Sequence, residues 1–435
     1  MAATGVIFSS ANSRFDRVPD FDPIYRVKET HMSDGSAQAW NMKLISQSDL
    51  GGFGNGGEGL ALQATADDRR IMYVAHESGP KDFTALDVTD PSEPIIIAQT
   101  EVPNDRVRSN SLDMVDDLLL VAYQGKEVGD APVGMGVWDV KDPENPKKIS
   151  HFDTSGPYSR GAHCLWFADG RYAYLATGAA DFQPHNPLDD QFFMIVDVGD
   201  PTNPTEVGRW WLPGTRVGDT EDPPERHPDF DTGFRLHNGN VWPERPDRAY
   251  LGYIDGGAIT LDVSDKSKPT MISRVDYHPP FPGFTHTVMP IFNRDLLIVS
   301  DESTVDHADD HPKLVWVMDN RDEKNPVIIS TFPLPDPGPF KNTQGRFGAH
   351  NLNENKPGPL SMQSDTLIVG SYFNGGVRVH DISDPFRPVE VAYYIPAYPE
   401  GMHGVNINDV YWDENGLIYA IDRFKGGMYI LELTL

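Results

Sequence analysis

Short apolar segments separated by polar turns recur along the whole chain, and six of them end in the same way. In each, an apolar strand ends in Asp, a second Asp follows three residues later, and Pro stands four residues after the second Asp. The residue directly after the second Asp varies between the copies. Asp accepts hydrogen bonds from the backbone amides that follow it, and Pro sets the direction in which the chain leaves the turn. Each copy therefore predicts a strand, a turn and a further strand. The first Asp of the copies lies at Asp87, Asp139, Asp197, Asp262, Asp319 and Asp381.

The spacing of these copies is 52 to 65 residues, and two more apolar strands precede each copy. Four strands in a unit of this length are typical of a β-propeller blade. A seventh unit begins near His403 and ends one strand short at Leu435, whereas the segment from Ala39 to Leu50 resembles the strand that follows each Pro. We therefore expect an all-β, seven-bladed β-propeller over residues 39–435, after an N-terminal extension over residues 1–38. The N-terminal strand would close the last blade and leave no open sheet edge.

The repeated pattern V-x-D-[VI]-x-D-P-x-x-P, with the apolar strand before it, resembles the LVIVD-repeat family of β-propellers. The resemblance extends from about Gly54 to Leu435 and implies the fold, but it is almost silent on activity. Two copies depart from the pattern, because Lys266 and Glu323 follow the second Asp where the other copies have Pro. We expect a looser turn in these two copies and no change of fold.

Charge and composition exclude several classes of function. The 36 Lys and Arg residues against 65 Asp and Glu residues give a net charge of -29, which disfavours binding to nucleic acid or to anionic lipid. The 39 Gly and 37 Pro residues fit a turn-rich β protein. Cys164 is the single cysteine, so a cysteine-based metal site is not expected. With neither a signal-like start nor an apolar stretch of membrane-spanning length, we expect a soluble, cytoplasmic protein that does not bind membranes.

Four histidines stand at equivalent positions in four consecutive blades. Each lies at the start of the first strand of its blade, and first strands line the central channel of a propeller, so the side chains should converge on the axis. Neutral imidazole suits a divalent transition metal, for which we expect iron first and then manganese, zinc or copper. The alternative is a set of polar residues that bind water in the channel. The four histidines are His163, His237, His286 and His350.

Other polar residues are expected at the same face of the ring. The second strand of a blade ends there, which makes Glu77 and Glu302 candidates for a catalytic acid or base, or for a partner of a metal-binding histidine. Strand-end acids are also common turn residues, which is the alternative. His403 stands about three residues before the aligned position, Asn406, and is expected in a loop above the site. Glu58 is a candidate for holding a substrate or water.

Three functions remain in competition. The first is an oxidoreductase that uses non-haem iron and O2 on a small organic substrate. Its layout is similar to that of the carotenoid-cleavage oxygenases, although their sequence motifs are absent here. The second is a manganese- or zinc-dependent lyase or hydrolase, in which an acid or His403 moves the proton; oligogalacturonate lyase is similar in arrangement. The third is a binding scaffold without metal. The sequence carries none of the motifs of nucleotide-dependent enzymes.

Overall fold

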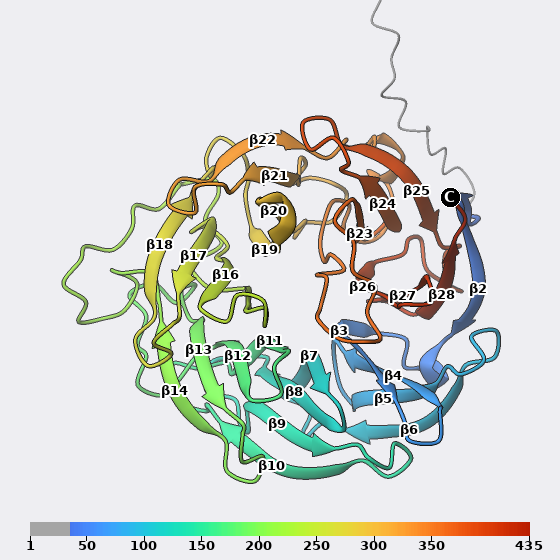
Figure 1. Ribbon diagram of the computed structural model, residues 1–435, viewed down its shortest axis with the longest axis horizontal. Coiled ribbons are helices and arrows are strands. Elements are labelled where there is room, and N and C mark those ends of the chain that lie inside the picture. The colour runs from blue at the N-terminus through green and yellow to red at the C-terminus, as the bar shows by residue number, and fades with distance from the viewer. Residues whose placement is uncertain (1–34) are drawn as a thin grey trace, which may run out of the picture.

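The computed structural model describes residues 35–435, which form a ring of four-stranded antiparallel units around a central axis (Figure 1). Five units are built from consecutive strands, and a single bridge between His76 and Ser109 joins the first to the second. The first two are β3 (Gly56–Ala64), β4 (Arg70–His76), β5 (Lys81–Asp87) and β6 (Ile95–Glu101), then β7 (Val107–Val115), β8 (Leu118–Gly125), β9 (Gly134–Asp139) and β10 (Lys147–Asp153).

The third, fourth and fifth blades follow the same order, from an inner strand at the axis to an outer strand at the rim. The strands are β11 (Ala162–Phe167), β12 (Tyr172–Thr177), β13 (Phe192–Asp197) and β14 (Thr205–Trp210); β15 (Asn238–Asn240), β16 (Arg248–Gly252), β17 (Ala258–Asp262) and β18 (Thr270–Val275); and β19 (Thr285–Ile291), β20 (Leu296–Asp301), β21 (Val315–Asp319) and β22 (Val327–Thr331). Three short 3-10 helices, η1 (Leu50–Gly52), η2 (Phe292–Arg294) and η3 (Gly338–Phe340), lie in the connections.

The N-terminal segment completes both remaining blades. The seventh blade has β26 (Ile407–Trp412), β27 (Leu417–Asp422) and β28 (Gly427–Leu433), and β2 (Met42–Ser48) pairs with β28 as its outer strand. This pairing confirms the predicted closure. In addition, β1 (Gln38–Trp40) pairs with β25 (Val389–Ile395) of the sixth blade, beyond β24 (Val377–Asp381) and β23 (Leu367–Ser371). The ring thus has seven blades, as predicted. Most of the predicted N-terminal extension, residues 1–34, lies outside the described residues.

The Asp residues of the repeat form the predicted turns. In the first copy, the amide of Thr89 donates to Asp87 Oδ1 at 3.0 Å, and that of Ser92 donates to Asp90 Oδ1 at 2.9 Å. The two copies without Pro make the same bond, at 3.0 Å to Asp265 and 3.1 Å to Asp322. The expectation of looser turns there was wrong, because the carboxylate holds the turn whether or not Pro follows it.

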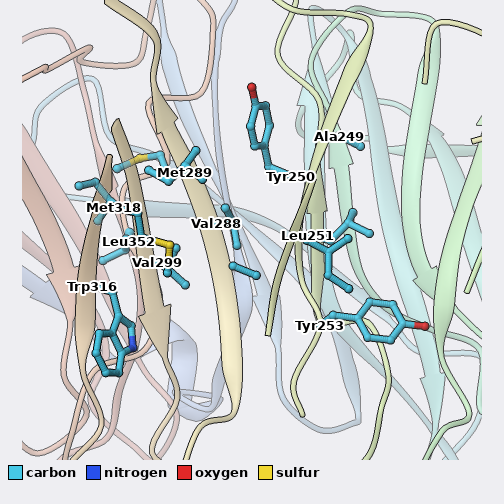
Figure 2. Close-up of a cluster of buried hydrophobic side chains, with 14 of the residues drawn as sticks. Ala249, Tyr250, Leu251, Tyr253, Val288, Met289, Val299, Trp316, Met318 and Leu352 are labelled. Carbon is cyan, nitrogen blue, oxygen red and sulfur yellow. The ribbon is translucent and has the colours of Figure 1, made fainter. Parts of the chain in front are cut away.

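The hydrophobic core lies between neighbouring blades, because each sheet packs both of its faces against the next. Figure 2 shows part of this core around the fourth and fifth blades, with Tyr250 and Leu251 on β16 and Val288 and Met289 on β19, where adjacent residues point to opposite faces of their sheet. All four side chains are buried. This packing holds the inner strands, and the residues at their starts, in fixed positions around the axis. Among residues 35–435, no helix is long and apolar enough to cross a membrane.

Candidate metal centre

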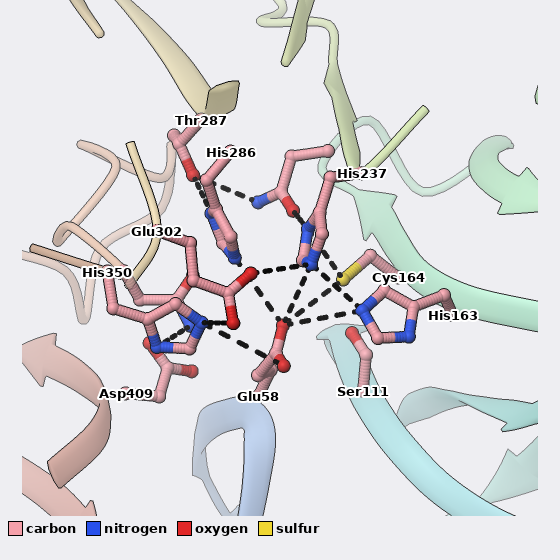
Figure 3. A network of polar contacts seen from close by, with 12 residues as sticks. Glu58, Ser111, His163, Cys164, His237, His286, Thr287, Glu302, His350 and Asp409 are labelled. Atoms are coloured by element: carbon pink, nitrogen blue, oxygen red, sulfur yellow. Dashed lines mark hydrogen bonds and ion pairs between the residues drawn. The ribbon is translucent and has the colours of Figure 1, made fainter. Parts of the chain in front are cut away.

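The four predicted histidines come together at the axis (Figure 3). The Nε2 atoms of His163 and His237 are 2.9 Å apart, and the ring centroids of His237 and His286 are 3.8 Å apart. The ring of His350 follows, with its centroid 4.5 Å from that of His286. All four residues are buried. The convergence expected from their equivalent positions in the repeat is therefore present.

A β-bulge brings two of these side chains, those of His163 and His286, to the axis. The pairing of β11 with β12 shifts register between Ala162 and Cys164, and that of β19 with β20 shifts between Thr285 and Thr287. The extra residue in each case is the histidine. A bulge turns one side chain out of the regular alternation of a strand and is common beside active sites. The same shift occurs around Glu58, around Asn110 and around Asn408.

The bulge corrects the alignment of the seventh blade. The sequence comparison placed Asn406 at the position of the histidines, but the register shift in β26 falls between Ile407 and Asp409, so Asn408 is the equivalent residue. Asn406 instead accepts a hydrogen bond from the amide of Arg346 at 3.2 Å. An alignment of strand starts does not account for the extra residue of a bulge, and this explains the error.

The other ring nitrogen of each histidine has an oxygen partner. His163 Nδ1 lies 3.0 Å from Gln124 Oε1, which also accepts two hydrogen bonds from Arg108. His237 Nδ1 lies 2.8 Å from Asn238 Oδ1. Because these amide oxygens can only accept, each ring carries its proton on Nδ1 and directs the lone pair of Nε2 toward the axis.

The remaining two histidines are held in a similar way. His350 Nδ1 donates to the backbone oxygen of Asn408 at 2.6 Å, and His286 Nδ1 lies 2.8 Å from Thr287 Oγ1. Their Nε2 atoms are buried and have no hydrogen-bond partner among the described residues. Partners of this kind usually orient the histidines of a metal site.

Two carboxylates lie against the four Nε2 atoms. Glu58 Oε2 is 3.6 Å from His286, 3.8 Å from His237 and 3.9 Å from His163, and Glu58 Oε1 is 3.9 Å from His350. The bulge around Glu58 in β3 directs its side chain to the axis as it does the histidines. Glu58, which was predicted only as a contact for substrate or water, is thus a central member of the cluster.

Glu302 follows β20 and reaches the cluster from the end of that strand, as predicted. Its carboxylate oxygens are 3.5 Å from the Nε2 atoms of His237 and His350. Arg346 Nη1 donates to Glu302 Oε1 at 2.6 Å and holds the carboxylate in place. Burial acts to raise the pKa of Glu302, but His350 and the Arg346 guanidinium outweigh it and lower the pKa to about 2. Glu302 is therefore ionised at neutral pH.

Burial keeps three of the imidazoles, those of His163, His237 and His350, neutral. It lowers the pKa of His163 well below its usual value, that of His237 to about 4 and that of His350 to about 3. Neutral rings that carry a proton on Nδ1 present free lone pairs at Nε2. The site therefore offers lone pairs to a cation without first having to lose protons at neutral pH.

The donor set fits a divalent transition metal. The Nε2 atoms of His163 and His237 are 2.9 Å apart, and their lone pairs face each other. Two such lone pairs repel unless a cation lies between them. Ligand atoms about 2.1 Å from one metal and at right angles to each other are about 3 Å apart, which agrees with this distance. The buried, unpartnered Nε2 atoms of His286 and His350 supply two further ligands. Glu58 and Glu302 supply the negative charge that would balance the metal.

Two predicted catalytic residues lie apart from the histidines. Glu77 follows β4 and forms ion pairs with Arg108 and Arg423, and no described contact joins it to a histidine of the cluster. His403 is exposed, and its backbone oxygen accepts a hydrogen bond from the amide of Gln344 at 3.0 Å. No contact among residues 35–435 joins the His403 ring to the cluster. The catalytic roles expected of Glu77 and His403 stay predictions.

Cys164 lies at the edge of the cluster, which the sequence reasoning did not anticipate. Its Sγ atom is 3.6 Å from Glu58 Oε2 and 3.8 Å from His237 Nδ1. Burial raises the pKa of the thiol well above its usual value, so Cys164 is a neutral neighbour and a weak ligand. Cys164 directly follows His163 in the sequence, and this position could have placed the thiol near the cluster. The number of cysteines was used only to exclude a cysteine-based metal site.

Comparisons with known proteins agree with the fold. Two segments, residues 189–211 and 247–277, match the LVIVD repeat family. No curated protein matches the sequence. The β-propeller domain of Myceliophteria thermophila Cps50 (Swd1) is similar over 90% of this chain and 100% of that one, at 12% identity and a TM-score of 0.54. Chaetomium thermophilum Raptor is similar over 92% of this chain and 30% of that one, at 11% identity and a TM-score of 0.55.

These matches confirm the β-propeller architecture. At such low identity the likeness concerns the fold alone, and a fold hosts many functions. Neither structure bears on the similarity of layout to the carotenoid-cleavage oxygenases. The function has to be argued from the residues at the axis.

Proposed function

We propose that the protein is a metal-dependent enzyme whose four axial histidines bind one divalent transition metal. The observation that carries the proposal is the short approach of His163 Nε2 and His237 Nε2, at 2.9 Å, with both Nδ1 atoms engaged by amide oxygens. A binding scaffold has no need for inward lone pairs and ionised carboxylates in a buried channel. An arrangement of this kind is costly to bury without a ligand.

The reaction class that we favour is the oxidation of a small organic substrate. Bound iron would supply activation of O2, and bound manganese or zinc would instead supply a Lewis acid. The metal would be held by His163, His237, His286 and His350. Because these ligands are neutral, the full positive charge of the metal would be available to the substrate. Arg346 holds Glu302 ionised and in place beside two of the histidines, where its negative charge would help to balance the metal.

The position of Glu58 keeps a lyase or hydrolase as the second candidate. Its carboxylate lies 3.6 to 3.9 Å from all four Nε2 atoms, so it would be close to any substrate atom that reaches the metal. A carboxylate there can remove a proton from a substrate carbon or from water, with no need for O2.

Elemental analysis of protein purified without a histidine tag tests the proposal. We expect about one iron per chain, together with consumption of O2 in the presence of substrate. Stoichiometric manganese or zinc would move the assignment to the lyase or hydrolase. Protein that contains no transition metal, and binds none when iron, manganese, zinc and copper are supplied in turn, would leave only the scaffold.

The orientation of His237 offers a more specific test. Asn238 Nδ2 donates to Glu354 Oε1 at 3.0 Å, which turns Asn238 Oδ1 toward His237 Nδ1. We expect Asn238→Leu to lower metal affinity about 10- to 100-fold, because the ring loses the partner that fixes its proton on Nδ1. Competition with a chelator of known affinity measures this change.

Asn240 provides the matched control. It lies on the same strand, β15, and donates to the same Glu354 oxygen at 3.0 Å, but it makes no described contact with a histidine. We therefore expect Asn240→Leu to retain the affinity of the unmodified protein. Equal losses in both variants would mean that Glu354 and the packing of the strand matter, and that the proton on His237 Nδ1 does not.

A further inference from the structure

A cavity of about 250 Å³ opens beside the histidine cluster, and it is unusually rich in arginine. One part of its wall is formed by four residues of the cluster, Glu58, His163, His237 and Glu302. A molecule in the cavity would therefore lie against the candidate metal centre. Phe284 adds an apolar surface. Five arginines line the rest, although the chain as a whole has a net charge of -29. They are Arg108, Arg160, Arg235, Arg346 and Arg423.

The arginines occupy related places in the repeat. In four of the seven blades, the second, third, fourth and sixth, an arginine stands two to four residues before the residue that reaches the axis. Because the blades repeat around the ring, these side chains meet at one end of the channel, as the axial residues do. The pairs are Arg108 with Asn110, Arg160 with His163, Arg235 with His237, and Arg346 with His350.

Carboxylates balance four of these guanidinium groups only in part. Arg160 pairs with Asp190, at 2.5 Å between Nε and Oδ2. Arg346 pairs with Glu302, as described above. Arg108 and Arg423 share the single carboxylate of Glu77. Three carboxylates thus serve four guanidinium groups, and even with Glu58 added the cavity has five positive charges against four negative ones.

Arg235 is the guanidinium group with no carboxylate partner. Its Nη1 donates to Gln191 Oε1 at 2.8 Å, and its Nε donates to the backbone oxygen of Thr232 at 3.3 Å. Within residues 35–435, no ion pair involves Arg235. Burial lowers the pKa of Arg235, whereas Asp190, Glu302 and Asp255 stabilise its charge only from beyond ion-pair contact. A bound anion in direct contact would offset the cost of this burial.

We propose that the cavity binds a carboxylate group of a small organic acid at Arg235, and that this acid is the substrate class of the proposed metal enzyme. Guanidinium and carboxylate are both planar and form two parallel hydrogen bonds, so an arginine selects this group by shape as well as by charge. In the metal-free protein the surplus is a single positive charge, which matches one carboxylate better than a doubly charged phosphate. Phe284 would contact the carbon chain of the acid. The assignment of the acid as substrate rests on the proposed function, whereas binding of the carboxylate does not.

Calorimetric titration of metal-free protein tests the binding separately from the metal. The protein is treated with a chelator, and the probes are butyrate, the neutral analogue butyramide and inorganic phosphate. We expect butyrate to bind, butyramide not to bind, and phosphate to bind more weakly than butyrate. Because no metal is present, a failure of the metal proposal leaves this result unchanged.

Variants of Arg235 identify the site. We expect Arg235→Gln to weaken butyrate binding at least about tenfold, which is the usual loss for a hydrogen bond to a charged group, and Arg235→Lys to weaken it less. Arg171→Gln is the control, because this exposed arginine pairs with Asp197 on the outer surface, and we expect it to bind like the unmodified protein. Circular dichroism checks that each variant is folded.

Three results would overturn the proposal. They are equal binding of butyramide and butyrate, tighter binding of phosphate than of butyrate, and unchanged butyrate affinity in folded Arg235→Gln and Arg235→Lys proteins. Metal content of Arg235→Gln should equal that of the unmodified protein, because Arg235 contacts none of the four histidines in the described structure. A loss of metal content together with a loss of butyrate binding would assign Arg235 to the metal centre and would also overturn the proposal.

Discussion

His286→Ala is expected to abolish stoichiometric metal binding while leaving the propeller folded. His286 is fully buried, its Nε2 has no partner among the described residues, and it lies between His237 and His350 in the cluster. Loss of a direct ligand should cost more than the roughly 10- to 100-fold in affinity that removal of an orienting partner costs. Metal analysis after dialysis, together with circular dichroism, measures both parts of the expectation.

The same result is expected for Ala at His163, His237 and His350, because each contributes one Nε2 atom to the same centre. The core lies between the blades, so a single axial side chain contributes little to the fold. His185→Ala is the control, since this histidine is exposed in the connection between β12 and β13. Full metal content in all four axial variants would contradict the site.

Deletion of residues 1–50 is expected to prevent soluble folding. The deletion removes β2, which pairs with β28 over its length, and β1, which pairs with β25. It also removes the hydrogen bond from Gln47 Nε2 to the backbone oxygen of Gly426, at 2.8 Å, and that from Asn41 Nδ2 to the backbone oxygen of Val391, at 2.9 Å. Two blades would then expose unpaired strand edges, which promote aggregation.

Deletion of residues 1–34 is the matched control, because it leaves both strands in place. We expect this shorter deletion to retain the melting temperature of the full chain, while the longer one yields insoluble protein or a strongly lowered melting temperature. An unchanged melting temperature in the longer deletion would show that the ring does not depend on closure by the N-terminal strands.

The repeat was enough to predict the architecture, because its signal is local. Each Asp accepts hydrogen bonds within its own turn, so the six copies mark the same strand end wherever they occur, and the equivalent turns form even at Asp265 and Asp322, where Pro is missing. The second role of the N-terminal segment was missed. The strand β1 is only three residues long and pairs with β25, about 350 positions away, so its own sequence carries no sign of the pairing.

The four histidines were also predictable, since equivalent positions in a ring of similar blades face one axis. The sequence indicated the neighbours that complete the site only in part, because it predicted Glu302 beside the histidines but not the central place of Glu58. Glu58 reaches the histidines through a bulge, which depends on the pairing of β3 with β4. The proton on His163 Nδ1 depends on Gln124, a residue of the preceding blade. The arginine that recurs before the axial residues was visible in the sequence, but its meaning depends on knowing where those strands begin.

The sequence by itself determined the all-β repeat, the number of blades and the four histidines at the axis, because these follow from local turn chemistry and from periodicity. The tertiary structure alone decided the bulges, the partners of each imidazole and the pairing of carboxylates with arginines in the cavity. Those features join side chains from different blades, for example Arg423 with Glu77, which are 346 positions apart. Contacts of that kind form only when the ring closes, so no pattern along the chain records them.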